Sequence, residues 1–414
     1  MMMNSRSFLA VALLVALAPA TVRPEEARPQ DKPDAKPPPA GPRHPVGPDV
    51  PLTEDEKSRL EKRVTVAGPT AAAVQAACER AAKEGLRVVV LPAGQYVFDS
   101  EVLVPAGLTV LGEGAGTVCK AGSKTAHLFR AGGDGVRFTR LRLEGAGATT
   151  STDNDTYGIT VERKQDVRID HCELTGFSYA TNFADEATAQ LDRCSVHHNL
   201  RDGLGYGVAL YSGAYVLIAD NEFAQNRHSL ASNGALDWSS PKTLGKYVHK
   251  PGVRKTHWEF VHNRVDSNDL SAYELCAVDT HPGMDGTFVI ERNLFENLRH
   301  GVGIRDGSGL IAANVFRSFR GKSFRPFVAI SVAYDTHNNI PVEGCMPHDI
   351  KVENNTFSTE GPPYRKCEVG KAENITLDGE LLPATKAERP PPPPMPLLSP
   401  MDAEGKLRIG TRPR

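Results

Sequence analysis

The chain has 414 residues, 31 of them proline, and a formal net charge of −2. Its length admits one large domain or two. Because there is no basic excess and no block of Lys and Arg alternates with aromatic residues, the composition argues against a nucleic-acid partner and leaves anionic substrates open.

The first 20 residues have the pattern of a secretory signal peptide. Arg6 precedes an apolar run over residues 8–17 that is too short to span a bilayer, and Ala18 and Ala20 offer small residues around a cleavage point. An uncleaved membrane anchor is the alternative. No later stretch is apolar enough to cross a membrane, so we expect a soluble mature protein that is secreted, periplasmic or held at the cell surface.

Pro-rich segments flank the rest of the chain. Residues 21–52 are rich in Pro and charged residues and nearly lack large apolar side chains, which predicts a disordered tether. A run of prolines over residues 390–394 marks the other end, and we expect the basic tail over residues 384–414 to be loose as well. Residues 53–383 then form a single folded domain.

Residues 70–85 are expected to form an α-helix. They are rich in Ala, carry apolar residues at Val74, Ala77, Cys78 and Ala81, and end at Gly85. Two strand and turn segments follow, over residues 88–96 and 104–117.

From residue 138 to residue 357 the chain repeats one short phrase. An apolar residue is followed three positions later by a residue that is most often Asn, and two positions after that by a second apolar residue. The shortest spacings between copies are 21 and 22 residues, a unit too small to bury its own apolar face, so the copies are expected to stack as a solenoid. The eight copies begin at Phe138, Ile169, Leu191, Ile218, Phe260, Ile290, Ile311 and Val352.

The units of this solenoid are predicted to be strands. Apolar residues alternate at period two, with Gly, Asn and Asp at the corners. We expect each Asn to lie in left-handed backbone at a bend, and stacked Asn residues to bond to one another along the axis. The predicted fold is an all-β, single-stranded parallel β-helix whose open N-terminal end is capped by the helix over residues 70–85.

The segment before the repeat is similar to the opening of the right-handed β-helix superfamily of the pectate lyases and polygalacturonases. The likeness lies in the Ala-rich helix, the strand and turn of residues 88–96 and the Gly-rich turn of residues 112–117. It covers roughly residues 64–380 and implies a right-handed β-helix. It is specific for the fold and weak for the activity.

The chain has seven cysteines. Cys172 and Cys194 hold the same repeat position in adjacent coils, where a strand spacing of about 4.8 Å is within reach of a disulfide. A pair of buried thiols is the alternative. Cys345 and Cys367 are a second candidate pair.

Two gaps in the repeat, of 42 and 41 residues, are long enough to hold insertions that could bind a ligand. The first contains Trp238, Tyr247, His249, Lys250 and Arg254, a basic segment with aromatic residues. Such a segment suits an acidic sugar and equally suits an exposed, solvated loop. We assign Lys250 and Arg254 to substrate binding.

Strand alternation predicts a polar column on one outer face. Where Val278 and Thr280 point inward, Asp279 and His281 point outward, and neighbouring coils stack such residues about 4.8 Å apart. The pairs Arg227 with His228 and Arg299 with His300 are expected on the same side, two coils apart. The predicted column consists of Tyr211, Asn233, Asp279, His281, Arg305 and Asp335.

A groove of His, Arg and Asp suits removal of the C5 proton of a uronic acid, as in uronate lyases and epimerases. The carboxylate of the sugar must be neutralised, which Arg305 or a metal can do. The base should titrate near the working pH, which suits His281 or His228, with Asp279 orienting the imidazole or binding a cation. The predicted substrate-binding set also includes Arg227, Tyr211, Asn233, His300 and Asp306.

Asp279, Thr280 and His281 resemble the Asp-Pro-His motif of the alginate C5-epimerases, which are also right-handed β-helices. The resemblance implies functional positions at Asp279 and His281. Thr280 stands where that family has Pro, and no Asp follows His281, so the substrate and the reaction stay open.

Other functions and ligands remain open. Hydrolysis requires two carboxylates about 5–9 Å apart, which Asp279 could form with Asp306 or Asp335. Outside enzymes, the alternative is a solenoid that binds carbohydrate or acts in surface adhesion without catalysis. Asp279, Asp285 and Asp306 offer oxygen ligands that suit Ca²⁺, but their spacing assigns no ion. The expected partner is a polysaccharide, in particular an anionic one, and we expect a monomer.

Overall fold

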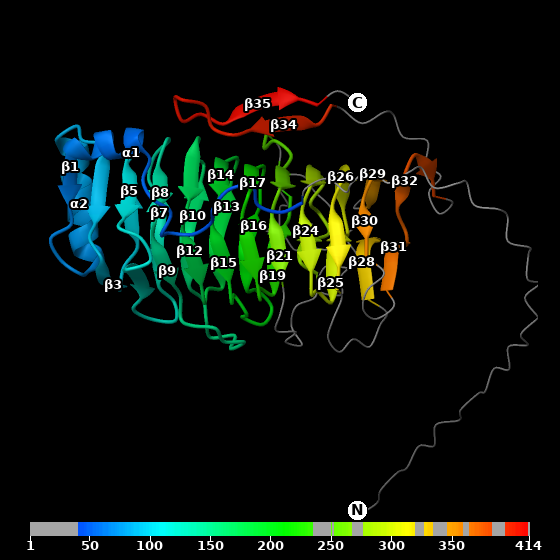
Figure 1. The fold of residues 1–414 in the computed structure, drawn as a ribbon, viewed down its shortest axis with the longest axis horizontal. Helices are drawn as coiled ribbons and strands as arrows, with labels where there is room; N and C mark the ends of the chain where they lie inside the picture. The colour runs from blue at the N-terminus through cyan, green and yellow to red at the C-terminus, as the bar shows by residue number, and fades with distance from the viewer. Residues whose placement is uncertain are drawn as a thin grey trace, which may run out of the picture. The chain divides into compact units, whose positions relative to one another are not determined.

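The chain winds through a stack of parallel strands (Figure 1). The computed structural model describes residues 40–234, 250, 252–266, 276–318, 327–333, 346–358, 364–382 and 394–412. All of these residues belong to one compact unit, from Pro37 to Arg414. Three stacked sheets, which we name A, B and C, run along this unit, and each coil adds one strand to each sheet in turn.

Sheet A has 13 strands among the described residues: β1 (Arg63–Thr65), β2 (Val88–Leu91), β5 (Thr109–Gly112), β8 (Arg137–Thr139), β11 (Val167–Asp170), β14 (Thr188–Asp192), β17 (Tyr215–Ala219), β20 (His257–Val261), β23 (Thr287–Glu291), β26 (Gly307–Ala312), β29 (Pro347–Glu353), β32 (Glu373–Leu377) and β33 (Glu380–Leu381). Sheet B has ten in the same part of the chain: β3 (Gly94–Phe98), β6 (Thr117–Ala121), β9 (Arg142–Glu144), β12 (Glu173–Thr175), β15 (Ser195–His197), β18 (Glu222–Ala224), β21 (Arg264–Asp266), β24 (Leu294–Glu296), β27 (Val315–Arg317) and β30 (Thr356–Phe357). Sheet C also has ten there: β4 (Val102–Val104), β7 (His127–Ala131), β10 (Tyr157–Glu162), β13 (Tyr179–Ala184), β16 (Tyr206–Leu210), β19 (His228–Ser232), β22 (Val278–Thr280), β25 (His300–Ile304), β28 (Phe327–Val332) and β31 (Tyr364–Val369).

The repeated phrase sets the register of these sheets. Its first residues pair with one another through sheet A, as in Ile218 with Phe260 and Phe260 with Ile290. Its last residues pair through sheet B, as in Phe295 with Phe316. The prediction of a parallel β-helix is confirmed, because every copy of the phrase occupies the same place in its coil.

Five asparagines, four buried and the last half-buried, form a ladder at the corner between sheets A and B. From Asn263 onward, each Asn side-chain oxygen accepts the backbone N–H and the side-chain N–H of the Asn one coil earlier, at 2.8 and 3.2 Å where Asn263 meets Asn293. The oxygen of the first residue, Asn221, accepts the backbone N–H of Cys194. Each side-chain NH₂ also donates to a carbonyl in the preceding coil. The ladder consists of Asn221, Asn263, Asn293, Asn314 and Asn355.

This ladder confirms the predicted bonding along the axis but corrects the backbone assignment. The left-handed residue is the one directly before each Asn, such as His262 (φ 55°) or Arg292 (φ 56°). The Asn itself turns inward, because its amide can satisfy buried backbone groups at the bend.

The core is filled by stacked apolar side chains. The rings of Phe295 and Phe316 lie 4.8 Å apart between centroids, and those of Phe316 and Phe357 5.4 Å apart. Cys172 and Cys194 are buried as free thiols, with the Cys172 N–H donating to Cys194 Sγ at 3.4 Å. The thiol alternative is therefore confirmed for this pair.

Cys367 is also a free thiol. Its candidate partner Cys345 lies outside the described residues.

The expected N-terminal helix is present as α2 (Ala71–Lys83), capped by the side chain of Thr70. Its apolar face is buried, and the Gln75 side chain bonds to the backbone N–H and C=O of Leu103 in β4, the terminal strand of sheet C. These bonds occupy part of an open strand edge. That the helix protects this end from association with other chains stays a prediction.

The chain before the β-helix is ordered over residues 40–52, which corrects the expectation of a disordered tether for that part, while residues 21–39 lie outside the described residues. The N–H groups of Gly41 and Gly47 donate to backbone carbonyls of later coils, and Arg43 forms an ion pair with Asp220 at 3.1 Å. A short helix, α1 (Glu54–Ser58), and a 3₁₀ turn (Arg59–Glu61) follow. Composition failed here because backbone groups and polar side chains such as Arg43 and Asp49, with Leu52 as one apolar contact, hold residues 40–52.

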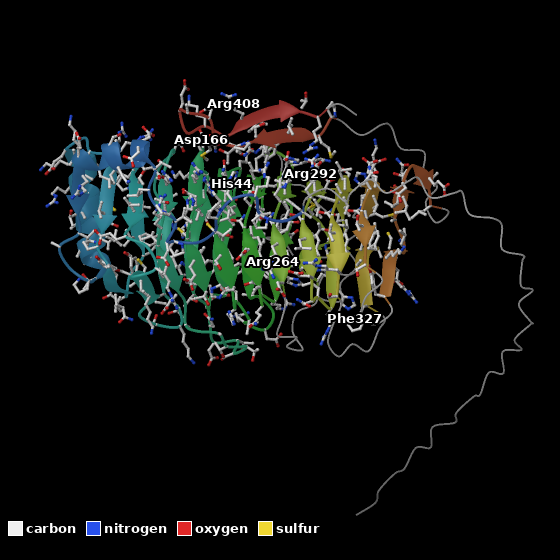
Figure 2. All side chains as sticks on the ribbon, viewed as in Figure 1. His44, Asp166, Arg264, Arg292, Phe327 and Arg408 are labelled. Atoms are coloured by element: carbon white, nitrogen blue, oxygen red, sulfur yellow. The ribbon has the colours of Figure 1, made fainter. Side chains whose placement is uncertain are left out.

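The expectation of a loose C-terminal tail is likewise wrong for residues 394–412. They contain a hairpin of β34 (Pro396–Ser399) and β35 (Arg408–Thr411). The hairpin segment binds sheet A through three side chains that accept its backbone N–H groups: Glu259 from Leu398, Gln190 from Met401 and Asp166 from Leu407. Figure 2 shows Asp166 beneath the hairpin that carries Arg408. The folded unit therefore extends beyond residues 53–383 at both ends.

Among the residues that the structure describes, no helix combines the length and the apolar character needed to cross a membrane.

We expect Asn293→Ala to lower the free energy of unfolding by about 3 kcal/mol, because the buried Asn263 N–H and Phe260 C=O of the preceding coil lose their partners. Asn355→Ala, at a half-buried rung, should cost about 1 kcal/mol because water can reach the groups that it leaves. Urea denaturation of both variants tests this. Equal losses would mean that the interior of the ladder is not held more strongly than its end.

The ion pairs that join Glu56 of α1 to Arg137 and Arg140 should weaken in acid. Burial alone would raise the pKa of Glu56, but the Thr53 N–H and the guanidinium groups of Arg137 and Arg140 outweigh it and lower the pKa from 4.5 to about 2. Since the folded-state pKa is depressed, the stabilisation is complete above pH 4.5 and is lost as the pH falls towards about 2.

Glu56→Gln should therefore cost about 1–2 kcal/mol at neutral pH and progressively less in acid. Urea denaturation at a series of pH values measures the difference. Glu54→Gln, in the same helix turn but exposed, is the matched control and should change little. A cost for Glu56→Gln that does not depend on pH would contradict the assignment.

Candidate active site

The candidate site is built on sheet C by three successive coils. Asp279 lies in β22, His228 lies at the start of β19 one coil earlier, and Arg305 follows β25 one coil later. In the strand register Asp279 has Ala231 on one side and Gly303 on the other. These small neighbours leave room for longer side chains to reach the carboxylate.

Asp279 is the centre of the cluster. Arg305 donates from Nε to Asp279 Oδ1 at 3.0 Å and from Nη2 to Oδ2. His281 Nε2 lies 3.2 Å and His228 Nε2 lies 3.7 Å from Asp279 Oδ2. Burial alone would raise the pKa of Asp279, but Arg305 first, then His281 and His228, outweigh it and hold the pKa well below its usual range. Asp279 is therefore a permanently ionised group with three nitrogenous neighbours.

His228 is a buried, neutral imidazole. Its side chain is 1% exposed. Its Nδ1 lies 2.6 Å from the carbonyl oxygen of Cys276, which requires a proton on Nδ1 and leaves the lone pair on Nε2. Nε2 has no hydrogen-bond partner among the described residues. Burial lowers the pKa of His228 to about 3, against the opposing attraction of Asp279.

Of the two imidazoles in the cluster, that of His281 is the one that solvent can reach. Its side chain is 15% exposed, compared with 6% for Asp279. The contact between His281 Nε2 and Asp279 Oδ2 fixes the orientation of the ring. Tyr206 borders both imidazoles, with its ring centroid 5.5 Å from that of His228 and 6.1 Å from that of His281.

Arg227 and Tyr206 form one edge of the site. Arg227 lies over the Tyr206 ring at 5.8 Å from the centroid, and its Nη1 lies 3.5 Å from the Tyr206 hydroxyl. Burial raises the pKa of Tyr206 to about 12, so the phenol is protonated at neutral pH.

Sequence reasoning missed an aromatic row that leads to the cluster. His127, Tyr157, Tyr179 and Tyr206 begin four successive strands of sheet C, and His228 begins the fifth. Neighbouring ring centroids lie 4.3, 4.6, 5.4 and 5.5 Å apart along this row. The signal was present in the sequence, because each of the three Tyr residues precedes a Gly or Ala and an alternating strand.

Asp306, one of the predicted substrate-binding residues, forms its hydrogen bonds with the backbone of neighbouring turns. Both oxygens of Asp306 accept backbone N–H groups, from Gly283 and Asp285 on Oδ2 and from Gly307 and Met346 on Oδ1. Asp306 is buried, which raises its pKa. Asp306 therefore stabilises the turns that supply these N–H groups. The prediction that it contacts substrate finds no support in the structure, because neither of its oxygens is exposed.

Arg254 and Asn233 are also engaged locally. The Arg254 guanidinium donates to the carbonyls of Gly213, Glu186 and Ala187 and lies 3.9 Å from the centroid of Tyr215. The Asn233 side-chain oxygen accepts the N–H of Gly234. The structure places Arg254 against a corner of sheet A rather than beside Asp279.

The remaining predicted residues stay predictions. Tyr211 and Asn233 directly follow β16 and β19, next to the column, and burial raises the pKa of Tyr211 well above its usual value. His300 begins β25, two coils from His228 as expected. Lys250 is exposed, and Trp238, Tyr247, His249 and Asp335 lie outside the described residues.

The family model described as "Right handed beta helix region" matches residues 133–357. No curated protein matches the sequence significantly. Among solved structures, a double mutant of the tailspike protein of E. coli bacteriophage HK620 is 12% identical, over 78% of this chain and 62% of that one, with a TM-score of 0.55.

Two similar structures are named for enzymes that act on polysaccharides. An alginate lyase from Paenibacillus sp. str. FPU-7 is 13% identical over 73% of this chain and 99% of that one, with a TM-score of 0.46. The A-module of a mannuronan C-5 epimerase from Azotobacter vinelandii is 14% identical over 77% and 98%, with a TM-score of 0.40. At such identities the likeness concerns the fold alone.

Asp279→Asn should lower the free energy of unfolding by about 2–4 kcal/mol, because Arg305 loses its charged partner within a largely buried cluster. Asp285→Asn is the matched control: its partner Lys255 is exposed, so the change should cost less than about 1 kcal/mol. Thermal and urea unfolding compare the two. Similar costs would show that the ion pair of Asp279 does not stabilise the fold.

Proposed function

Because the chain belongs to the right-handed β-helix family, and because a buried Asp joins a His and an Arg on the outer face of one sheet, we propose that it acts on an acidic polysaccharide by abstracting the C5 proton of a uronic acid. The single observation that carries the proposal is the bridging of His281 and Arg305 by Asp279. Polysaccharide-acting β-helix proteins among the similar structures agree with the substrate class at a coarse level.

His281 is the proposed base. When its Nε2–H donates to Asp279 Oδ2, a neutral imidazole carries its lone pair on Nδ1. The ionised Asp279 stabilises the imidazolium that forms when the ring accepts a proton, as a buried carboxylate does beside a catalytic imidazole. His228 suits this role less, because it is 1% exposed and burial lowers its pKa to about 3.

Arg305 is the proposed neutralising group. Its side chain is 25% exposed, so it can approach the carboxylate of a sugar while it still holds Asp279. Proton transfer from C5 to His281 leaves the electron pair of the C5–H bond delocalised onto that carboxylate, where positive charge stabilises it. Breaking the bond from C4 to its oxygen then gives elimination, whereas return of a proton to the opposite face gives epimerisation.

Hydrolysis by Asp279 with Asp306 is disfavoured by the surroundings of these two carboxylates, while Asp335 lies outside the described residues. Asp279 is bound by Arg305 through both oxygens, and Asp306 is bound by four backbone N–H groups. A hydrolase requires one carboxyl that gives a proton and a second that activates water or attacks the sugar. Neither of these two side chains has an oxygen placed for such a role.

The predicted signal peptide agrees with this substrate class, since acidic polysaccharides of cell envelopes lie outside the cytoplasm. We therefore also propose that the protein is exported. Cleavage after Ala20 would be seen as a mature N-terminus at Thr21.

The test is the ultraviolet absorbance of the unsaturated uronate formed by elimination, together with proton NMR for epimerisation, on alginate, pectate, glycosaminoglycans and ulvan. We expect one of these polymers to react and His281→Ala to lower the rate at least about 100-fold, the usual worth of a positioned base. His44→Ala, an exposed His outside the site, is the matched control and should react as the unsubstituted chain does. Full activity in a folded His281→Ala variant would refute the assignment of the base, and no reaction with any polymer would favour the non-catalytic binding protein.

A further inference from the structure

We infer that His228 Nε2, Asp279 Oδ2 and His281 Nε2 form a binding site for a divalent transition metal ion of the zinc type. The donor atoms of the three side chains lie within 4.8 Å of one another. The inference concerns these donors only and does not depend on the proposed uronate chemistry.

The orientation of His228 is the first argument. Its Nδ1–H donates to the Cys276 carbonyl at 2.6 Å, so the lone pair of Nε2 points towards the Asp279 carboxylate at 3.7 Å. Both of these facing atoms are hydrogen-bond acceptors. Nε2 is buried without a hydrogen-bond partner among the described residues, an arrangement that a cation between the two atoms would satisfy.

The spacing of the donors is the second argument. Tetrahedral zinc with bonds of about 2.0–2.2 Å places its ligand atoms roughly 3.3–3.5 Å apart. Asp279 Oδ2 lies 3.2 Å from His281 Nε2 and 3.7 Å from His228 Nε2. The two imidazole nitrogens lie within 4.8 Å of each other, so the rings must approach one another for all three atoms to reach bonding distance of one ion.

The surrounding contacts are the third argument. A metal-binding His usually donates its other ring N–H to a carbonyl or carboxylate, which fixes the tautomer and the ring orientation. His228 makes this bond to Cys276. Arg305 binds both oxygens of Asp279, with Nε at 3.0 Å from Oδ1 and Nη2 on Oδ2, and so fixes the carboxylate whose Oδ2 lies next to the two imidazoles.

The donor types select the ion. Two imidazole nitrogens and one carboxylate suit Zn²⁺, Co²⁺, Ni²⁺ or Fe²⁺, whereas Ca²⁺ and Mg²⁺ prefer sites made entirely of oxygen. Because the charge of Arg305 balances that of Asp279, the ion would keep a net positive charge. An anionic fourth ligand, such as hydroxide or the carboxylate of an acidic sugar, would be favoured at the side where His281 meets solvent.

Metal binding and the proposed base are mutually exclusive at His281. A metal on Nε2 displaces the proton that Nε2 would donate to Asp279, and the neutral ring then carries its proton on Nδ1. The metal-bound form would lack the base on Nδ1. Metal binding is measured on the chain without any polymer, so its outcome does not depend on whether the chain reacts with a uronate.

The experiment is titration of the full chain, freed of metal by a chelator, with Co²⁺ and then with Zn²⁺. We expect one equivalent of Co²⁺ to give the visible absorption of a four-coordinate site without a thiolate charge-transfer band, Zn²⁺ to displace it, and Zn²⁺ to raise the melting temperature. His281→Ala and His228→Gln should each weaken binding at least about 10-fold, in the range usual for a lost contact at a metal site.

His44→Ala is the matched control and should bind as the unsubstituted chain does. Because His228 is buried, the metal affinity of its variant is interpreted only if circular dichroism shows that the variant is folded. If it is not folded, the affinity of the more exposed His281→Ala variant tests the inference. Absence of tight binding at one equivalent, a thiolate band, or unchanged affinity in folded His281→Ala would overturn the inference.

Discussion

The parallel register between successive coils is the constraint on which the rest of the structure depends. A shift of one residue would turn every inward side chain outward, so the ladder of Asn221, Asn263, Asn293 and their successors fixes more than local bonds. It sets which residue of each coil follows the corner and, two strands later, which residue faces outward on sheet C. The meeting of His228, Asp279 and Arg305 from three coils is a consequence of that register.

Small side chains in the same register make the cluster possible. Asp279 lies between Ala231 and Gly303 in sheet C. A Cβ on Gly303 would lie 2.8 Å from Cys276 Sγ and 3.6 Å from Asp279 Oδ1. The absence of a side chain at Gly303 therefore keeps Cys276 in place, and the Cys276 carbonyl in turn fixes the tautomer of His228. Packing at one glycine is thus linked to the chemistry of a histidine two coils away.

The sequence correctly predicted the parts of the molecule that repeat. It failed where individual hydrogen bonds determine the position of a side chain or a chain end. The period of the phrase fixes the coil, and the alternation around Val278 and Thr280 correctly turns Asp279 and His281 outward. Periodicity cannot reveal that Asp306 is saturated by backbone N–H groups, or that Arg254 binds the carbonyls of a distant corner, because those contacts depend on turn geometry. The same reason explains the ends, where Glu259 and Gln190 accept backbone groups of a hairpin whose composition resembles that of a free tail.

The chemistry of the site depends on what lies between His228 Nε2 and Asp279 Oδ2. Arg305 binds both oxygens of Asp279 and keeps the carboxylate ionised. A proton on the carboxylate therefore does not bridge the two acceptor atoms, His228 Nε2 and Asp279 Oδ2, that face each other. Burial opposes protonation of His228, which leaves its Nε2 without a proton to share. His281 can turn a proton on Nε2 towards the carboxylate, and a metal ion can instead draw in all three donors. Both states use Asp279 Oδ2. If that oxygen accepts the Nε2 proton of His281, the cluster offers a base to a ligand, and if it binds a metal ion, the cluster offers a bound cation.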